Sequence, residues 1–260
     1  RRAVARDDLV SAIAADTVLA VFAIFCRIGS CLMLMPGTSS SLLPSQIRLF
    51  AAIALTFGLS PLLLPTMRGA IGDGQPFAVL SLMGSELIIG TVIGLAARIY
   101  FLALQTLGAV MANAIGITAI PGVPLEDNEA MPSLASLISL SAVTLVFASG
   151  QHWELLGGLV RSYGVWPPSE GVSAGIRLTT LVDRLSASFM LALRVASPFL
   201  IYAVIVNLAI GLANKLTPSI PVYFISLPFV MAGGLILLYQ IGGEVLTQFM
   251  TGFVTWLEVQ

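Results

Sequence analysis

Six long stretches of this chain are dominated by apolar side chains, and they limit what the chain is able to fold into. They cover residues 9–35, 49–64, 77–116, 133–160, 172–216 and 222–256. A helix crosses the ~30 Å hydrocarbon core of a membrane with about 20 mostly apolar residues. Only 10% of the residues are charged, whereas a soluble domain has about 25%. The sequence therefore predicts an all-α integral membrane protein with about six long, interrupted helical regions and helical hairpins.

Several functional classes lack the residues that they need. The formal net charge of -1 gives no electrostatic support for nucleic-acid binding. The chain has no Gly-x-x-x-x-Gly-Lys-Ser/Thr loop for nucleotide phosphates. His152 is the single histidine and belongs to no Cys/His cluster. We therefore expect no enzyme activity, no catalytic or metal-binding residue and no cofactor.

Prolines and glycines divide the apolar stretches. Pro61 interrupts the second stretch and Pro65 closes it, so that residues 66–76 are expected to form a surface loop. Pro198 is the expected kink of the fifth stretch, and Pro228 is expected to break the last one together with two pairs of glycines.

A stripe of small and charged residues runs along the third stretch. Glu86, Gly90, Gly94 and Arg98 recur every four residues, which places them on one helix face. Small residues let helices approach closely, and charges in apolar helices usually face a protein interior or an aqueous cavity. Two readings stay open, namely packing inside the chain and contact with another subunit.

Two further stripes have the same spacing of four. Gly108, Ala112 and Gly116 end the third stretch, and Asn207, Gly211 and Lys215 end the fifth. Both are candidates for helix packing or subunit contact. Arg27, inside the first stretch, also needs a partner from elsewhere in the chain or the assembly.

The most irregular stretch covers residues 108–132. It begins as the small-residue end of a helix, becomes a run of prolines and glycines, and continues with three carboxylates. Irregular backbone in an apolar protein must be buried in protein or line an aqueous cavity, because hydrocarbon offers no hydrogen-bond partner. We therefore expect this segment to project into a pathway.

Several segments taken together resemble a known family. They are Phe25-Cys-Arg-Ile-Gly-Ser, Met33-Leu-Met-Pro, Leu43-Pro-Ser-Gln-Ile-Arg-Leu, Asn207-Leu-Ala-Ile-Gly-Leu-Ala-Asn-Lys-Leu-Thr-Pro and Val222-Tyr-Phe-Ile-Ser-Leu-Pro. Their order and spacing are similar to those of the FliR family of flagellar biosynthesis proteins, whose virulence-secretion relatives form a parallel branch. The resemblance covers nearly the whole chain.

The resemblance implies a structural and gating subunit of the flagellar type III protein-export channel. Residues 1–260 would form one export-gate domain, in which residues 1–170 are FliP-like and residues 171–260 form a FliQ-like helix pair. The implied partners are FliP-like and FliQ-like gate subunits, FlhA-like and FlhB-like export components, unfolded flagellar substrates and membrane lipid, with no nucleic acid. The implied location is the bacterial inner membrane within the flagellar basal body, with the gate raised toward the periplasm.

The same resemblance implies that the loop after the third helical region plugs the closed pore. On this chain the plug corresponds to residues 116–131, with residues 108–116 as its packed stem. Apolar side chains would obstruct the pore by dewetting, and glycines would allow unusual backbone angles. The expected plug residues are Gly116, Ile117, Ile120, Pro121, Gly122, Val123, Pro124, Leu125 and Met131.

A small-solute secondary transporter is the alternative. Interrupted helices and charged residues inside apolar regions support it, but the two halves show no convincing repeat. The sequence leaves open the subunit ratio, the topology of the spans and the open-state position of the plug. It does not fully separate flagellar from virulence secretion, although the Asn-Lys-Leu-Thr-Pro segment favours the flagellar branch.

Overall fold

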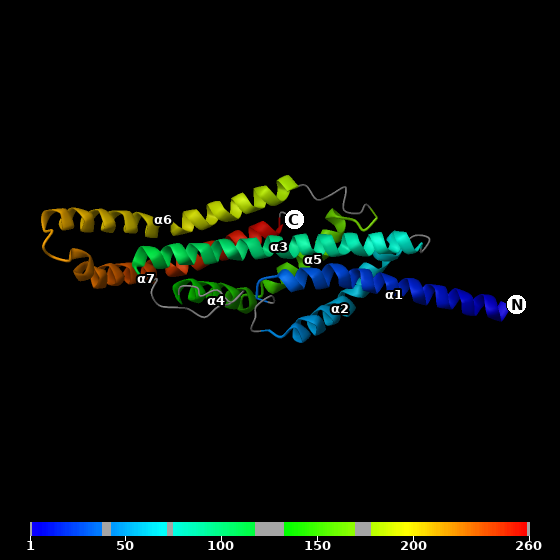
Figure 1. Cartoon of the computed structure of the whole chain (residues 1–260). Helices are drawn as coiled ribbons and strands as arrows, with labels where there is room; N and C mark the ends of the chain where they lie inside the picture. The colour runs from blue at the N-terminus through cyan, green and yellow to red at the C-terminus, as the bar shows by residue number, and fades with distance from the viewer. Residues whose placement is uncertain (1, 38–42, 72–74, 118–132, 170–177, 259–260) are drawn as a thin grey trace. The chain divides into compact units, whose positions relative to one another are not determined.

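The computed structural model describes residues 2–37, 43–71, 75–117, 133–169 and 178–258. Within these residues the regular structure is entirely helical, which confirms the predicted all-α class (Figure 1). The helices are α1 (Arg2–Leu34), α2 (Ser45–Ile71), α3 (Pro76–Ile115), α4 (Ser133–Ala148), α5 (His152–Val165), α6 (Leu178–Leu216) and α7 (Val222–Glu258).

Helix length and hydropathy confirm the integral membrane class. Among the described residues, five helices are long and apolar enough to cross a membrane, and α4 with α5 makes a sixth if the bent pair counts as one span. The prediction of one helical region over 133–160 was wrong, because α4 and α5 meet at an angle of 75°. Gly150 lies in this break with φ of 76°, a left-handed conformation that commonly ends a helix.

The predicted interruption of the second stretch was also wrong. Helix α2 continues through Pro61 and Pro65 to Ile71. The predicted surface loop at 66–76 was therefore wrong for residues 66–71, which belong to α2. A proline in a helix removes the hydrogen bond to the carbonyl four residues earlier. For Pro61 that carbonyl belongs to Phe57, and the Ser60 hydroxyl donates to it at 2.9 Å. The serine thus replaces the lost backbone donor.

The same arrangement occurs in α6. Pro198 frees the Arg194 carbonyl, and the Ser197 hydroxyl donates to that carbonyl at 2.7 Å. Serine hydroxyls serve this purpose inside membranes, where no water replaces the missing bond. Helix α7 likewise continues through Pro228 and its paired glycines without a break. The dipeptides Ser60-Pro61 and Ser197-Pro198 were the sequence signal that α2 and α6 continue.

The helices form two compact units. Unit 1 consists of Arg1–Arg98 and Trp153–Val182 with Gln260, and unit 2 of Ile99–His152 and Asp183–Val259. Helix α3 therefore contributes its first half to unit 1 and its second half to unit 2. In unit 1, α1 packs against α2, and in unit 2, α4 packs against α7.

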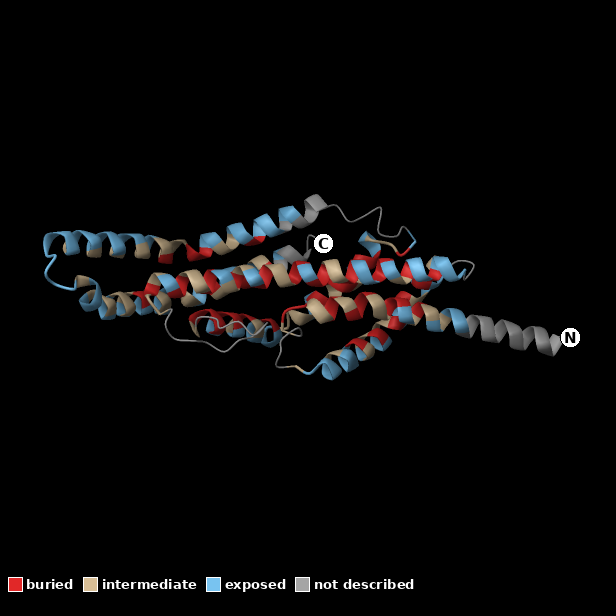
Figure 2. Cartoon of the chain, viewed as in Figure 1, coloured by how far each residue is buried: buried red, intermediate tan, exposed pale blue. Residues whose placement is uncertain are grey.

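In unit 2, α6 and α7 form a hairpin, in which residues 217–221 make the connecting turn. Much of its apolar surface is exposed, as Figure 2 shows on both helices near the turn. Leu208 is 72% exposed, Phe224 74% and Tyr239 89%. Such surface suits lipid or another protein chain. The division into a FliP-like part and a FliQ-like hairpin concerns likeness to other proteins and stays a prediction.

Candidate functional site

A buried ion pair lies at the centre of unit 1. The Arg27 guanidinium of α1 donates from Nε to Glu86 Oε2 at 2.6 Å and from Nη2 to Glu86 Oε1 at 2.7 Å. Both side chains are 0% exposed. This bidentate geometry uses both carboxylate oxygens, and it is the strongest form of ion pair between protein side chains. The contacts of Glu86 are therefore internal to the chain.

The guanidinium also reaches α5 and the residue that follows it. Arg27 Nη1 donates to Ser162 Oγ at 3.2 Å, and Nη2 donates to the Trp166 carbonyl at 3.0 Å. The Tyr163 ring lies against the guanidinium, 3.9 Å from Arg27 Cζ to the ring centroid. One arginine thus connects α1, α3 and the end of α5. The partners Ser162, Tyr163 and Trp166 were not named from the sequence.

The glycine stripe of α3 brings two backbones together in unit 1. A Cβ on Gly90 would lie 2.1 Å from Ser30 Oγ and 2.2 Å from the Arg27 carbonyl oxygen. A Cβ on Gly94 would lie 2.6 Å from the Cys31 carbonyl oxygen. The glycines therefore allow α1 to lie directly on α3. Arg98, the last member of the stripe, is half-buried.

The stem of the central loop is anchored in unit 2. A Cβ on Gly108 would lie 2.7 Å from the Ala135 Cα, so α3 and α4 touch at backbone distance. Ala112 is fully buried on the same stripe. Ile115, the last residue of α3, is also fully buried. It packs against Gly234 of α7 so closely that a Cβ on Gly234 would lie 2.5 Å from Ile115 Cγ2. The end of α3 is thus held by both α4 and α7.

Gly116 ends α3 and sets the direction in which the chain leaves it. Its φ is 81°. Its amide donates to the Asn113 carbonyl at 3.2 Å, and the Ile117 amide donates to the Ala112 carbonyl at 2.9 Å. This pair of bonds is the Schellman motif, in which a left-handed glycine satisfies the last helix carbonyls.

Gly116 also lies close to α7. A Cβ on Gly116 would be 3.4 Å from Leu227 Cδ1 and 4.0 Å from Met231 Cγ. The start of the loop is therefore placed by packing as well as by its hydrogen bonds.

The other predicted site residues divide into two groups. Asn207, Gly211 and Lys215 are all exposed on α6, and a Cβ on Gly211 would meet nothing within 4 Å. Seven expected plug residues lie outside the described part of the chain. They are Ile120, Pro121, Gly122, Val123, Pro124, Leu125 and Met131.

The described residues include no metal-binding cluster, and the single histidine makes an aromatic contact. No group of three or more His, Cys, Asp and Glu side chains able to hold a metal occurs among the described residues. The His152 ring stacks on Phe147 with their centroids 5.7 Å apart.

Comparison with known protein families shows to which family the chain belongs. The model of the family described as "Bacterial export proteins, family 1" matches residues 18–255. The chain belongs to this family. The match runs from α1 to the last turns of α7 and thus includes both the buried ion pair and the loop stem.

Relatives of the chain come from flagellar and other secretion systems. The flagellar biosynthetic protein FliR of Caulobacter vibrioides is 27% identical over 221 residues, which cover 83% of this chain and 85% of the relative. FliR of Aquifex aeolicus is 28% identical, covering 82% and 81%. The secretion system apparatus protein SsaT of Salmonella typhimurium is 27% identical, covering 82% and 83%. This bacterial export protein is accordingly a membrane subunit of a type III export apparatus.

Proposed function

We propose that this export protein is a structural and gating subunit of the flagellar type III export channel, and that residues 116–131 plug its closed pore. The FliR relatives, which align with more than four fifths of the chain, support the flagellar assignment. The proposed location is the inner membrane part of the flagellar basal body, with the gate raised toward the periplasm.

The observation that carries the plug proposal is the fixed base of the loop. Gly116 ends α3 in a Schellman motif, and Ile115 beside it is fully buried against Gly234. The chain returns at Ser133 into α4, which contacts α3 at Gly108 and Ala135. Both ends of the proposed plug are thus held within one unit.

The length of the loop allows a wide pore to be closed. Residues 118–132 separate the two anchored ends. At about 3.3–3.6 Å per residue, fifteen residues reach at most ~50 Å when extended. Because both ends are anchored, the tip of the loop projects at most about half of that length. The apolar side chains between Ile117 and Leu125 would then fill a constriction and exclude water and ions from it.

The proposed partners are FliP-like and FliQ-like gate subunits and FlhA-like and FlhB-like export components, with unfolded flagellar proteins as substrates. Residues 1–170 would take a FliP-like place in the assembly, and the α6–α7 hairpin a FliQ-like one. The exposed apolar surface of this hairpin supports a partner-covered position. Asn207, Gly211 and Lys215 are the proposed subunit contact on α6, because they are exposed and Gly211 leaves open space beside it.

Co-expression with FliP-like and FliQ-like subunits, followed by mass measurement of the intact complex, tests this role. We expect one defined complex that contains this chain. Replacing residues 118–132 with a Gly/Ser linker of equal length should leave the subunit composition of the complex unchanged, because the anchors lie outside the replaced segment. Gly211→Leu should weaken the complex by about tenfold or more in retention without changing the stability of the chain alone. A stable lone monomer under these conditions would contradict the proposal.

A further inference from the structure

The end of α3 and the start of the loop rest on one face of α7. Leu227, Met231 and Gly234 follow one another at spacings of four and three residues, which places them on the same side of the helix. A Cβ on Gly116 would lie 3.4 Å from Leu227 Cδ1 and 4.0 Å from Met231 Cγ. A Cβ on Gly234 would lie 2.5 Å from Ile115 Cγ2. We call Leu227, Met231 and Gly234 the loop seat.

A tyrosine of α6 holds the same segment of α7. The Tyr202 hydroxyl donates to the Val230 carbonyl at 2.7 Å. A Cβ on Gly233 would lie 2.5 Å from the Tyr202 hydroxyl oxygen, so the absence of a side chain there lets the hydroxyl reach the backbone of α7. Val230 and Gly233 each directly precede a residue of the loop seat. One hydrogen bond therefore attaches α7 to α6 at the level of the loop seat.

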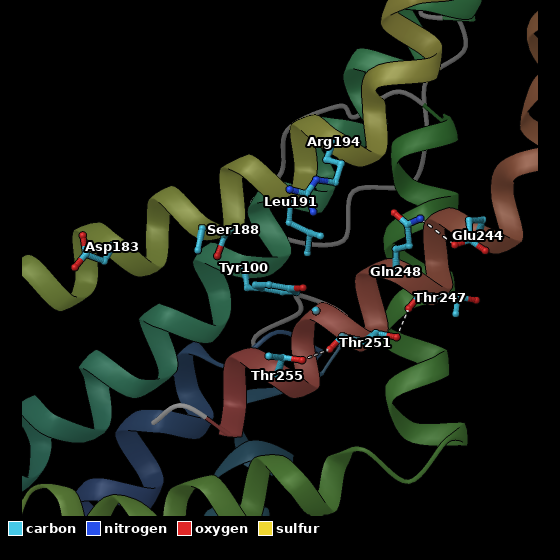
Figure 3. A pocket seen from close by; sticks show the side chains of 12 residues that line it. Tyr100, Asp183, Ser188, Leu191, Arg194, Glu244, Thr247, Gln248, Thr251 and Thr255 are labelled. Carbon is cyan, nitrogen blue, oxygen red and sulfur yellow. Dashed lines mark hydrogen bonds between the residues drawn. The ribbon is translucent and has the colours of Figure 1, made fainter.

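Farther from the turn, polar side chains of α7 form hydrogen bonds within their own helix. The hydroxyls of Thr251 and Thr255 donate to the carbonyls four residues earlier, and Gln248 donates to Glu244 (Figure 3). The two helices there line a groove with a volume of about 770 Å³. Among the residues of α6 and α7 whose side chains the structure describes, the bond of Tyr202 is the only hydrogen bond that joins the two helices.

Helix α7 contains an uncompensated proline beside the loop seat. Pro228 has no amide hydrogen, so the Phe224 carbonyl loses its usual helical donor. In α6 the serine directly before the proline donates to the freed carbonyl. In α7 the residue before the proline is Leu227, and the Ser226 hydroxyl donates instead to the Tyr223 carbonyl at 2.9 Å. Because helices bend at such prolines, contacts with other helices have to fix the position of the loop seat.

The bond between α6 and α7 lies in the apolar part of both helices. Tyr202 falls within the candidate span Leu185–Leu216, and Val230 falls within Val222–Phe253. Hydrocarbon offers neither donor nor acceptor, so a broken bond would leave the hydroxyl unsatisfied. The hydroxyl therefore favours the arrangement of the two helices in which the bond is made.

We propose that Tyr202 is a positioning residue of the gate, whose hydroxyl fixes the loop seat and so holds the plug in its closed position. The inference rests on the proposed function, since it needs a plug, and it adds the residue that connects the α6–α7 hairpin to that plug. When the bond to Val230 breaks, α7 is free to bend at Pro228, and the side chains beneath Ile115 and Gly116 move. The hairpin thereby takes part in closing the pore.

Removal of one hydroxyl tests the role of Tyr202. Tyr202→Phe keeps the ring and loses the hydrogen bond, whereas Tyr239→Phe makes the same change at a tyrosine of α7 that is 89% exposed. We expect Tyr202→Phe to raise ion leakage through the assembled gate in a planar bilayer about two- to tenfold, which is the effect of one hydrogen bond on an equilibrium between closed and open states. Tyr239→Phe should leak no more than the wild type. Leakage of Tyr202→Phe equal to that of the wild type would overturn the proposal.

A second variant reaches the same bond from α7. Gly233→Ala should raise leakage to a similar degree, because its Cβ would displace the Tyr202 hydroxyl. Gly243→Ala on the same helix is the matched control, since a Cβ at that position meets nothing within 4 Å. A Gly233→Ala gate that leaks no more than the Gly243→Ala gate would contradict the proposed role of the bond.

The complex with a Gly/Ser linker in place of residues 118–132 separates an effect on the plug from general damage. In this complex Tyr202→Phe should add no further leakage, because no plug is left to position. An equal increase with and without the linker would overturn the role of Tyr202 and leave the plug proposal standing. A Tyr202→Phe chain that fails to assemble would assign the hydroxyl to folding and would likewise overturn this proposal alone. A linker complex that stays closed would overturn both proposals.

Discussion

Arg27 of α1 and Glu86 of α3 form a bidentate ion pair with no exposed surface, closed by two hydrogen bonds of 2.6 and 2.7 Å. A buried pair is a weak source of net stability, because removal of both charges from water offsets most of their attraction. Its importance lies in what happens when one partner is lost. The remaining charge then has no water and no counter-ion within a segment made to enter a membrane.

Glu86→Ala should therefore destabilise unit 1 by about 3–5 kcal/mol, because Arg27 stays buried without its carboxylate. The double variant Arg27→Met with Glu86→Leu should cost clearly less than either single change. Thermal unfolding of the purified chain in detergent measures both. Glu154→Gln is the control, since its 3.6 Å pair with Arg161 is about half exposed and such pairs contribute ~0–1 kcal/mol. Equal losses in Glu86→Ala and Glu154→Gln would contradict the account.

The close approach of α1 to α3 makes a second prediction within one helix. Gly90→Ala should destabilise the chain by about 1–3 kcal/mol, because its Cβ would lie 2.1 Å from Ser30 Oγ and 2.2 Å from the Arg27 carbonyl oxygen. Gly84 on the same helix has open space at its Cβ position. Gly84→Ala should thus be neutral or stabilising by up to ~1 kcal/mol. Unfolding temperatures measured side by side check the difference, and a reversed order would disprove the packing.

The sequence predicted the helices better than their ends. Apolar length located five of the helices, α1, α2, α3, α6 and α7, to within several residues, because a membrane requires long continuous runs. It misjudged Pro61, since the loss of a backbone bond was counted without the Ser60 hydroxyl that replaces it. The helix also continues through Pro65. The same reasoning also joined α4 to α5, because hydropathy does not register a left-handed glycine such as Gly150.

The candidate sites were found from the sequence only in part. The spacing of four singled out Glu86 and its glycines, and Arg27 was expected to need a partner. Arg27 and Glu86 lie 59 positions apart in the sequence and on different helices. The periodicity of one helix is unable to reveal such a pairing. Gly116 was expected to allow unusual backbone angles, and its φ of 81° is of that kind.

Gly116 offers a test of how the loop is directed. Gly116→Ala should cost about 1–2 kcal/mol, because an L side chain is strained at φ of 81°, and it should shift the start of the loop. Gly116→Asn is the matched variant, since asparagine adopts the left-handed conformation more readily. We expect Gly116→Ala to raise ion leakage through the assembled gate more than Gly116→Asn does. Identical leakage in both variants and the wild type would contradict the claim that Gly116 directs the loop.

Electrical conductance of the assembled gate in a planar bilayer tests the central claim most directly. The wild-type complex should stay closed to ions. The complex in which a Gly/Ser linker of equal length replaces residues 118–132 should conduct continuously, with its anchors at Ile115 and Ala135 intact. A linker complex of correct mass that stays as closed as the wild type would contradict the claim that this loop plugs the pore.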